Sequence, residues 1–264
     1  MNPRIGIVVP TLGERIDYLS QCIESINKAG TDKNSPFVVL VAPETFDASS
    51  YLRSGSIHKV VKDAGLGLAQ AINAGFSEMP KEIEYINWLG DDDMLSVRSL
   101  DLTSAFLDSH PKTVMVFGGC NYVDQENRIV WRNSSGPWAV PLLRFGPDLI
   151  PQPGALFRRT AFESVGRLAT SYPLAFDFEL FIKLSKVGKI SHLDQVLSSF
   201  RWHPESLSVN HRSKSAADAS KVRISHLPAI LRPLSVVWEF PIRLATLLAG
   251  QFVTARAKSK SRDK

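Results

Sequence analysis

Tyr85-Ile-Asn-Trp-Leu-Gly-Asp-Asp-Asp-Met94 is the segment of this chain that says most about its fold. The apolar run over 83–89 predicts a buried strand, and three consecutive carboxylates follow its end. Adjacent carboxylates repel one another, so such a turn is tolerated most easily when a cation or several backbone N–H groups offset the charge. Hard oxygen ligands of this kind suit Mg²⁺ or Mn²⁺. The alternative is an exposed acidic turn that caps the following helix.

On both sides of this segment, β-rich runs alternate with helical patterns, which predicts a parallel sheet with crossover helices. The strands are nearly continuous in apolar residues, so we expect helices on both faces of the sheet. The expected strands are 5–10, 37–41, 57–61, 83–89 and 114–117, and the expected helices lie near 19–26, 68–78, 97–109 and 175–187. A hairpin over 121–138 and a loop over 145–153 interrupt this order. Ligands of open α/β sheets bind at the carboxyl ends of strands, so the triple-aspartate turn predicts a nucleotide-diphosphate site.

Composition limits the class of protein. The chain has 264 residues, of which 44% are hydrophobic and 22% are charged, as in soluble globular proteins of one or two domains. Two cysteines cannot supply a disulfide framework, so a reducing compartment is expected. The first residues do not resemble a secretory signal. Together these features predict a cytoplasmic protein.

The positive charge is confined to one end of the chain. Of a formal net charge of +5, residues 221–264 contribute nine Lys/Arg against two Asp/Glu, which is +7 and leaves −2 for residues 1–220. The body therefore has no basic excess, and we do not expect a nucleic-acid partner.

Three motifs occur in order and at compatible spacing: Val8-Val-Pro-Thr-Leu-Gly-Glu-Arg15, Gly67-Leu-Ala-Gln-Ala-Ile-Asn-Ala-Gly75 and Leu89-Gly-Asp-Asp-Asp-Met-Leu95. Together they resemble the family 2 glycosyltransferases, in which a strand ends in Pro-Thr, a helix carries Ala-x-Asn-x-Gly and a later strand closes in Leu-x-x-Asp-Asp. The resemblance covers roughly residues 4–205. It implies an α/β protein of the GT-A fold, with a mostly parallel central sheet flanked by helices. It also implies a catalytic domain over 1–210, divided into a donor half (1–118) and an acceptor half (119–210). A C-terminal amphipathic helical segment and basic tail would follow over 211–264.

The resemblance also implies which residues bind the nucleoside-diphosphate sugar. Those residues are Pro10, Thr11, Glu14, Glu44, Asp63, Asn73, Asp91 and Asp92. Asp93 would hold Mn²⁺ or Mg²⁺, and His203, in the tract Ser199–Ser208, would contact the metal or the diphosphate. The loop after the second strand departs from the family pattern, so Glu44 or Asp47 would replace the aspartate that reads the base. The nucleotide stays open, with uridine first by family frequency.

The acceptor half contains the expected catalytic base. Ile150–Arg159 looks like the family's acceptor-side strand and helix and includes Gln152, an expected acceptor contact. Ala175–Leu184 is similar to the helix that supplies the base, which makes Asp177 the base and Phe176 a replacement for the family's glutamate. Apolar neighbours raise the pKa of such a carboxyl, whereas a helix start lowers it. Glu179 is the second choice and an expected acceptor contact; the alternative role of Asp177 is a helix cap.

These residues predict an inverting glycosyltransferase that moves a sugar from a nucleoside-diphosphate donor, first of all a UDP-sugar, to a hydroxyl of a glycan or lipid-linked acceptor. Cell-envelope or extracellular polysaccharide synthesis is the expected setting. Two alternatives stay open: an inactive nucleotide-sugar-binding scaffold, and a sugar-nucleotide pyrophosphorylase. Pyrophosphorylases carry a Gly-Gly-x-Gly-Thr-Arg loop after the first strand, whereas this chain has Thr11-Leu-Gly-Glu-Arg15 there.

The tail carries an apolar helical stripe, interrupted by three prolines and followed by a basic cluster. The stripe comprises Leu227, Leu231, Leu234, Trp238, Ile242, Ala245, Leu248 and Phe252. It suits peripheral association with the cytoplasmic face of an anionic membrane, or packing on the domain or on a second subunit. The apolar stretch over 244–253 is too short to span a bilayer.

Overall fold

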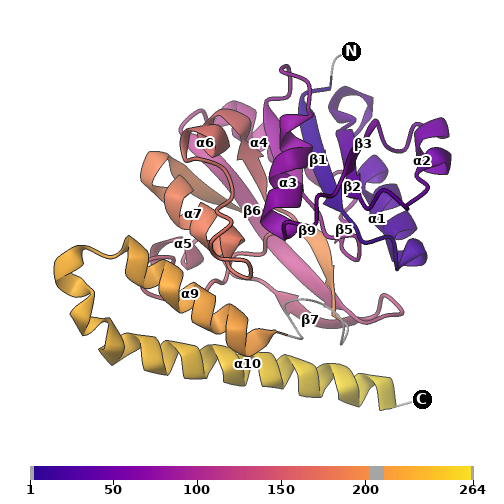
Figure 1. The fold of residues 1–264 in the computed structure, drawn as a ribbon. Helices are drawn as coiled ribbons and strands as arrows, with labels where there is room; N and C mark the ends of the chain where they lie inside the picture. The colour runs from indigo at the N-terminus through magenta and orange to yellow at the C-terminus, as the bar shows by residue number, and fades with distance from the viewer. Residues whose placement is uncertain (1–2, 203–210, 263–264) are drawn as a thin grey trace.

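The computed structural model describes residues 3–202 and 211–262, and its centre is a single twisted sheet (Figure 1). Four strands of the first half pair in parallel in the order β3-β2-β1-β4. Their bounds are Ile5–Pro10 (β1), Phe37–Ala42 (β2), Lys59–Lys62 (β3) and Tyr85–Trp88 (β4). The parallel sheet expected from the alternating pattern is therefore present, with strand boundaries that differ from the expected ones by at most two residues.

The second half of the sheet is mixed. Next to β4 the order continues β8-β6-β9-β5, and β7 pairs with β6. Only β6 and β9 run parallel there; the β4–β8, β6–β8, β6–β7 and β5–β9 pairs are antiparallel. The bounds are Met94–Leu95 (β5), Thr113–Val123 (β6), Ile129–Asn133 (β7), Leu156–Arg158 (β8) and Lys189–Arg201 (β9).

Helices cover both faces, as the apolar strands predicted. Alternate residues of β1 belong to different cores: Ile5, Ile7 and Val9 pack with α1 (Ile16–Ala29) and α4 (Ser99–Ser109). Val8 packs with the opposite layer. That layer consists of α3 (Leu68–Ser77), α6 (Arg159–Ser164) and α7 (Phe176–Val187). Short helical turns at η1 (Asp32–Asn34), α2 (Ser49–Arg53) and α5 (Ala139–Leu142) complete this part.

The C-terminal segment forms two helices against α7 and β7 (Figure 1). They are α9 (Arg212–His226) and α10 (Val236–Arg262), joined by the short turns η2 (Ala229–Leu231) and η3 (Pro233–Ser235). A buried ion pair holds α9 to α10, with Arg223 Nη2 2.6 Å from Glu239 Oε2. Within the described chain, no helix has both the length and the apolar content needed to cross a membrane.

The stripe predicted for the tail does not lie on one face. Leu227 is buried, whereas Leu234 and Leu248 are both 55% exposed. The reason is that the chain between α9 and α10 consists of short turns at prolines, so the helical phase is reset before α10 begins.

The tract Ser199–Ser208 begins inside the sheet. Residues 199–201 belong to β9, where Arg201 pairs with Val123 of β6. Both ends of this long strand contain buried residues, whereas its middle is exposed at Asp194 and Gln195.

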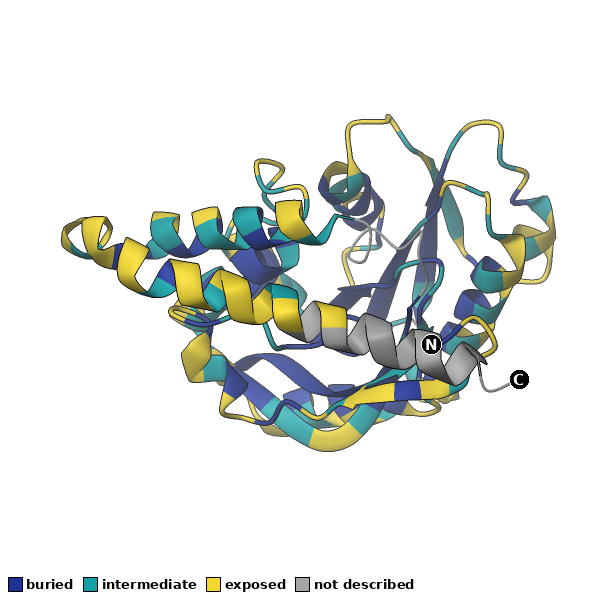
Figure 2. Ribbon diagram, turned by 90° about the horizontal axis from the view of Figure 1, so that it is seen from below, coloured by how far each residue is buried: buried dark blue, intermediate teal, exposed yellow. Residues whose placement is uncertain are grey.

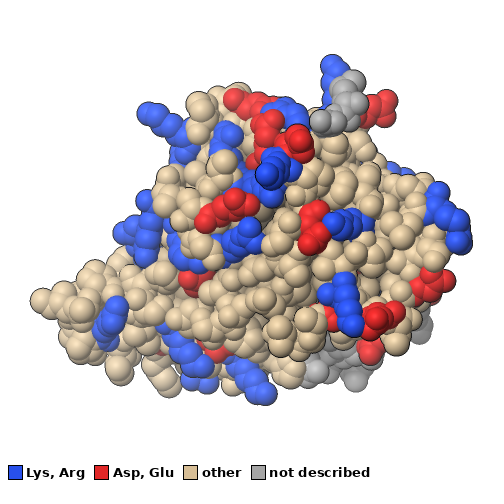
Figure 3. All heavy atoms as spheres, turned by 45° about the horizontal axis from the view of Figure 1, so that its top comes forward, with Lys and Arg blue, Asp and Glu red and all other residues tan. Residues whose placement is uncertain are grey.

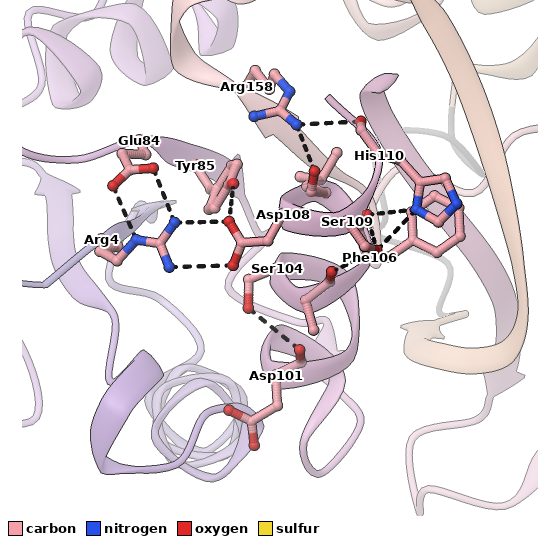
Figure 4. Close-up of polar contacts among 12 residues, drawn as sticks. Arg4, Glu84, Tyr85, Asp101, Ser104, Phe106, Asp108, Ser109, His110 and Arg158 are labelled. Atoms are coloured by element: carbon pink, nitrogen blue, oxygen red, sulfur yellow. Dashed lines mark hydrogen bonds and ion pairs between the residues drawn. The ribbon is translucent and has the colours of Figure 1, made fainter. Parts of the chain in front are cut away.

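A charged network ties the elements together at the amino ends of β1 and β4 (Figure 4). Arg4 pairs with Glu84 and Asp108, and the Tyr85 hydroxyl donates to Asp108 Oδ1 at 2.6 Å. Arg158 donates to backbone carbonyls, including that of Thr113 at 2.7 Å. This network is structural, since it lies at the ends of the strands opposite to the acidic turn. Figure 3 shows acidic and basic side chains interspersed over one face of the molecule.

Candidate active site

The first part of the site is formed where β1 and β4 end side by side, with Val8 opposite Trp88. Thr11, directly after β1, donates its hydroxyl to Asp91 Oδ2 at 2.6 Å and accepts the N–H of Gly13 at 3.0 Å. Arg15 places Nη2 2.9 Å from Asp91 Oδ1 and Nη1 3.4 Å from Asp92 Oδ2. Burial raises the pKa of Asp91, and Thr11 and Arg15 oppose that shift. The Pro-Thr strand end and the acidic turn are thus one connected structure.

The second part joins the acidic turn to the end of β9. Asp93 is 5% exposed, and its Oδ1 accepts the backbone N–H of Arg201 at 3.0 Å. The fully buried Arg201 donates Nε to the carbonyl of Asp92 at 3.0 Å, and its guanidinium lies 4.2 Å from the ring centroid of Tyr18. Burial and the charge of Asp92 raise the pKa of Asp93 well above the usual aspartate value. The negative charge at Asp93 is therefore only partly compensated by the protein.

Gly90 explains how the carboxylates converge. A Cβ at this position would lie 2.9 Å from Asp92 Oδ1 and 3.2 Å from Asp93 Oδ2. A side chain at this position would crowd the two carboxylates, so glycine leaves them room to converge. Carboxylate oxygens whose charge is not fully compensated are suitable ligands for a hard divalent cation. No cluster of three or more His, Cys, Asp or Glu side chains in metal-binding arrangement is present among the described residues.

The other expected donor contacts lie around the same strand ends. Pro10 ends β1, and Glu14 is exposed in the loop after it. Glu44, after β2, pairs with Lys62, and Asp63, after β3, accepts the N–H of Gly65 at 3.0 Å. Their contacts with a donor stay predictions.

Asn73 makes a structural contact instead of pointing into the acidic turn. Its Nδ2 donates to the carbonyl of Leu168 at 2.9 Å, and its Oδ1 accepts the N–H of Leu168 at 3.2 Å. The motif asparagine thus joins α3 to the loop after α6, and a direct donor contact stays a prediction.

Asp177 lies in the first turn of α7 and faces a pocket of about 290 Å³ between α7, α9 and α10. Its Oδ1 accepts the N–H of Phe178 at 2.8 Å. Burial raises the pKa of Asp177, and this hydrogen bond opposes the shift. Asp148 lines the same pocket, and burial together with the charge of Asp177 raises the pKa of Asp148 strongly. The pocket also receives Arg212 and Ser215 from α9 and Arg243 and Thr246 from α10.

Aromatic packing connects the pocket to the acidic turn. Phe176, which stands in place of the family's glutamate, is 7% exposed, and its ring centroid lies 5.9 Å from that of Trp88. Trp88 in turn stacks on Phe157 at 5.5 Å. The departure at Phe176 therefore joins α7 to the end of β4. Gln152 has a related role, since its Nε2 donates to Asn87 Oδ1 and to the Trp88 carbonyl, both at 2.9 Å.

Glu179 lies away from this pocket. It is 6% exposed and contacts Lys183 at 3.1 Å and His226 of α9 at 3.6 Å. A contact with the acceptor at Glu179, as at Gln152, stays a prediction. His203 lies outside the described residues.

Arg15, Arg201 and Asp148 belong to the site but were not expected from the sequence. Arg15 and Arg201 were visible inside the quoted motifs, yet only the fold shows that both reach the acidic turn. Asp148 had no signal, because it lies in a proline-containing loop whose path is determined by its neighbours.

A twisted mixed sheet flanked by helices on both faces, with an acidic turn where its parallel strands end, has the architecture of the GT-A class of glycosyltransferases. Solved structures of that class match this chain. S. aureus TarS 1–349 in complex with UDP matches with a TM-score of 0.58 and 14% identity, covering 99% of this chain and 92% of that one. The mannosyltransferase PcManGT from Pyrobaculum calidifontis, in complex with GDP-Man and Mn²⁺, matches with a TM-score of 0.63 and 16% identity, covering 99% and 80%.

The family model "Glycosyl transferase family 2" matches residues 6–166, and the chain belongs to that family. Curated relatives include uncharacterized glycosyltransferases of Rickettsia prowazekii and Rickettsia felis, each 24% identical. The matches cover 76% and 77% of this chain, but only 65% and 35% of the relatives. The chain thus spans less than two thirds of their length.

Proposed function

We propose that this protein transfers a sugar from a nucleoside-diphosphate donor to an acceptor hydroxyl with inversion at the anomeric carbon. The observation that carries the proposal is the buried acidic turn 91–93, attached by Thr11, Arg15 and Arg201 to two strand ends. Such an arrangement leaves charge that a cation and a diphosphate would compensate. A UDP-sugar is the first choice of donor; the neighbouring structures with UDP and with GDP-Man support the donor class.

Asp177 acts as the general base in this proposal. Its carboxylate accepts the proton of the acceptor hydroxyl while that oxygen forms a bond to the anomeric carbon and the bond to the diphosphate breaks. A raised pKa makes the carboxylate a better proton acceptor near neutral pH. No covalent intermediate with the protein is needed, because one displacement gives the inverted product.

Asp93, with Asp91 or Asp92, would hold the Mn²⁺ or Mg²⁺ ion. A bound divalent cation would stabilise the charge of the leaving diphosphate. Arg201 positions this turn, because its Nε donates to the Asp92 carbonyl and its backbone N–H donates to Asp93 Oδ1. The Mn²⁺ in the PcManGT complex supports a cation of this kind.

The proposed acceptor is a hydroxyl of a glycan or of a lipid-linked carrier. It reaches Asp177 through the pocket between α7, α9 and α10. Envelope or extracellular polysaccharide synthesis on the cytoplasmic face of a membrane is the proposed setting. Division into a donor half, an acceptor half and a C-terminal segment belongs to the same proposal.

Thermal unfolding with UDP, GDP, dTDP and CDP, each with and without Mn²⁺ or Mg²⁺, tests the donor site. A nucleotide near 100 times its Kd should stabilise the protein by roughly 2.7 kcal/mol. Asp93→Asn should lose the metal-dependent shift; its Oδ1 can still accept the Arg201 N–H, so the fold is kept. Asp177→Asn should keep the shift but lose about 10²- to 10⁴-fold in release of nucleoside diphosphate from the matching sugar donor.

The results separate the alternatives. A shift without any donor turnover would favour the nucleotide-sugar-binding scaffold. Formation of the sugar nucleotide from a sugar phosphate and a nucleoside triphosphate would favour a pyrophosphorylase. Absence of a shift with every nucleotide, in protein that remains folded, would refute the proposed donor site.

A further inference from the structure

Large apolar side chains gather on the outer side of the C-terminal segment. Seven of them are between 47% and 82% exposed: Ile230, Leu234, Val236, Val237, Phe240, Leu244 and Leu248. Exposed apolar residues that gather in one segment mark an interaction site more often than scattered single residues do. We call the α10 part of this surface, formed by Val236, Val237, Phe240, Leu244 and Leu248, the outer face.

The opposite side of α10 is already used inside the molecule. Glu239 is 8% exposed and bonds Arg223 of α9 through both carboxylate oxygens, at 2.7 and 2.6 Å. Arg243 and Thr246 line the pocket of Asp177. Residues 237, 240, 244 and 248 follow helical spacing, so they lie on one side of the helix, and Figure 2 shows exposed residues along it.

The charged residues in the sequence of α10 are almost all basic. The sequence of α10 contains Arg243, Arg256, Lys258, Lys260 and Arg262 against a single acid. That acid is Glu239, which is buried and paired with Arg223. An anionic lipid bilayer has negatively charged headgroups above an apolar interior. An apolar helix face with basic residues nearby and no exposed acid complements both layers.

We propose that the outer face of α10 docks on the surface of an anionic lipid bilayer, with the helix lying along the membrane. Only the consequence for the acceptor, given next, rests on the proposed function. Because Arg243 and Thr246 lie on the other side of the same helix, docking would hold the pocket of Asp177 about one helix diameter, roughly 10 Å, from the lipid surface, which favours an acceptor carried by a lipid.

A second copy of the chain fits the outer face less well. Pairing two copies through this face would bring two basic helices together with no exposed acid on either to compensate them. Like charges across an interface oppose association, whereas anionic headgroups attract the same residues.

Flotation of the intact protein with lipid vesicles tests the proposal, without any nucleotide. Vesicles of equal parts phosphatidylcholine and phosphatidylglycerol should carry the protein, and pure phosphatidylcholine should carry much less. Raising salt to roughly 0.5 M should weaken binding, because the Debye length falls to about 4 Å. The variant Phe240→Glu/Leu244→Glu should bind the anionic vesicles about tenfold or more weakly, since two apolar contacts are lost and two negative charges added.

The matched control is Leu52→Glu/Leu102→Glu, which adds the same charge at exposed leucines of α2 and α4, 45% and 44% accessible. It should bind like the unmodified protein. A second pair, Val237→Glu/Leu248→Glu, should reproduce the loss if the first pair fails to fold. Because no donor is needed, failure of the proposed transfer reaction would leave this result unchanged.

Three results would overturn the inference. One is that the unmodified protein does not float with anionic vesicles, or floats equally with neutral ones. Another is that both outer-face variants bind as well as the control. The third is that the protein is a dimer in solution that the outer-face substitutions dissociate, which would assign the face to a second copy.

Discussion

Two carboxyl groups, Asp148 and Asp177, line one pocket although they come from different segments of the chain. Burial raises the pKa of both, and the charge of Asp177 adds to the shift at Asp148. The native protein therefore binds protons more tightly than the unfolded chain at these positions. Stability from this source is present at low pH and decreases as pH rises from the unfolded aspartate pKa through the raised native values.

Asp148→Asn should consequently stabilise the protein at neutral pH, by an amount of the order of 1 kcal/mol, because it removes a buried charge. The asparagine Oδ1 can still accept the Ile150 N–H that Asp148 accepts at 3.2 Å. Urea unfolding at pH 7.5 and at pH 4 measures the difference, which should shrink at the lower pH. Asp194→Asn, at an exposed position of β9, is the control and should change little at either pH. A destabilised Asp148→Asn at neutral pH would contradict the explanation.

Other residues show which parts of the site the sequence pattern indicates and which parts only the fold reveals. The turn Asp91–Asp93 drew attention through its three adjacent carboxylates, whereas the assignment of these residues to the donor and the metal came from the family resemblance and stays a prediction. Arg15 and Arg201 were not chosen, since an arginine within a motif does not reveal which of many carboxylates it will meet. Their contacts depend on β1 and β9 ending near β4, which is a property of the sheet.

At the scale of elements, Gly188 lies at the junction of α7 and β9, where a glycine is needed for close packing. Gly188 directly follows α7, and its φ of −173° is an extended conformation open to any residue. The requirement is space: a Cβ would lie 2.2 Å from Cγ1 of Val114. Helix α7 thus turns directly into β9 against β6.

Gly188→Ala should destabilise the protein by about 1–3 kcal/mol, because the β-branched Val114 side chain has few other rotamers to adopt. Gly119→Ala is the matched control in β6, where the added Cβ would find its nearest atom at 3.4 Å. Chemical denaturation of both variants gives the comparison. Equal stability of the two would show that the close approach is relieved at no cost.

For the whole molecule, the central finding is that the C-terminal segment completes the pocket of the candidate base. The sequence suggested a tail that either binds a membrane or packs on the domain. In the structure α10 packs on the domain with one side and leaves apolar residues exposed on the other, and membrane association of that exposed side stays a proposal.

The buried pair Arg223–Glu239 should hold this arrangement. Arg223→Met and Glu239→Met should each destabilise the protein by about 3–5 kcal/mol, because each leaves an uncompensated buried charge. The double variant should recover much of that loss, as a double-mutant cycle in urea would show. Hydrogen exchange should become faster in α10 in the single variants. The nucleotide-induced thermal shift should persist in them, because the donor strand ends belong to β1–β4; its loss would refute the proposed division into halves.

The amino-acid sequence by itself determined the class of fold, the order of the first four strands and the position of the acidic turn. These features depend on local patterns: apolar runs make buried strands, and the motifs follow strand ends at characteristic spacing. The tertiary structure alone decided which arginines hold the acidic turn, that Asp148 accompanies Asp177, and that α9 and α10 form one wall of the pocket. Those contacts join residues far apart in the chain, such as Asp93 with Arg201, and their partners are selected by packing rather than by any local pattern.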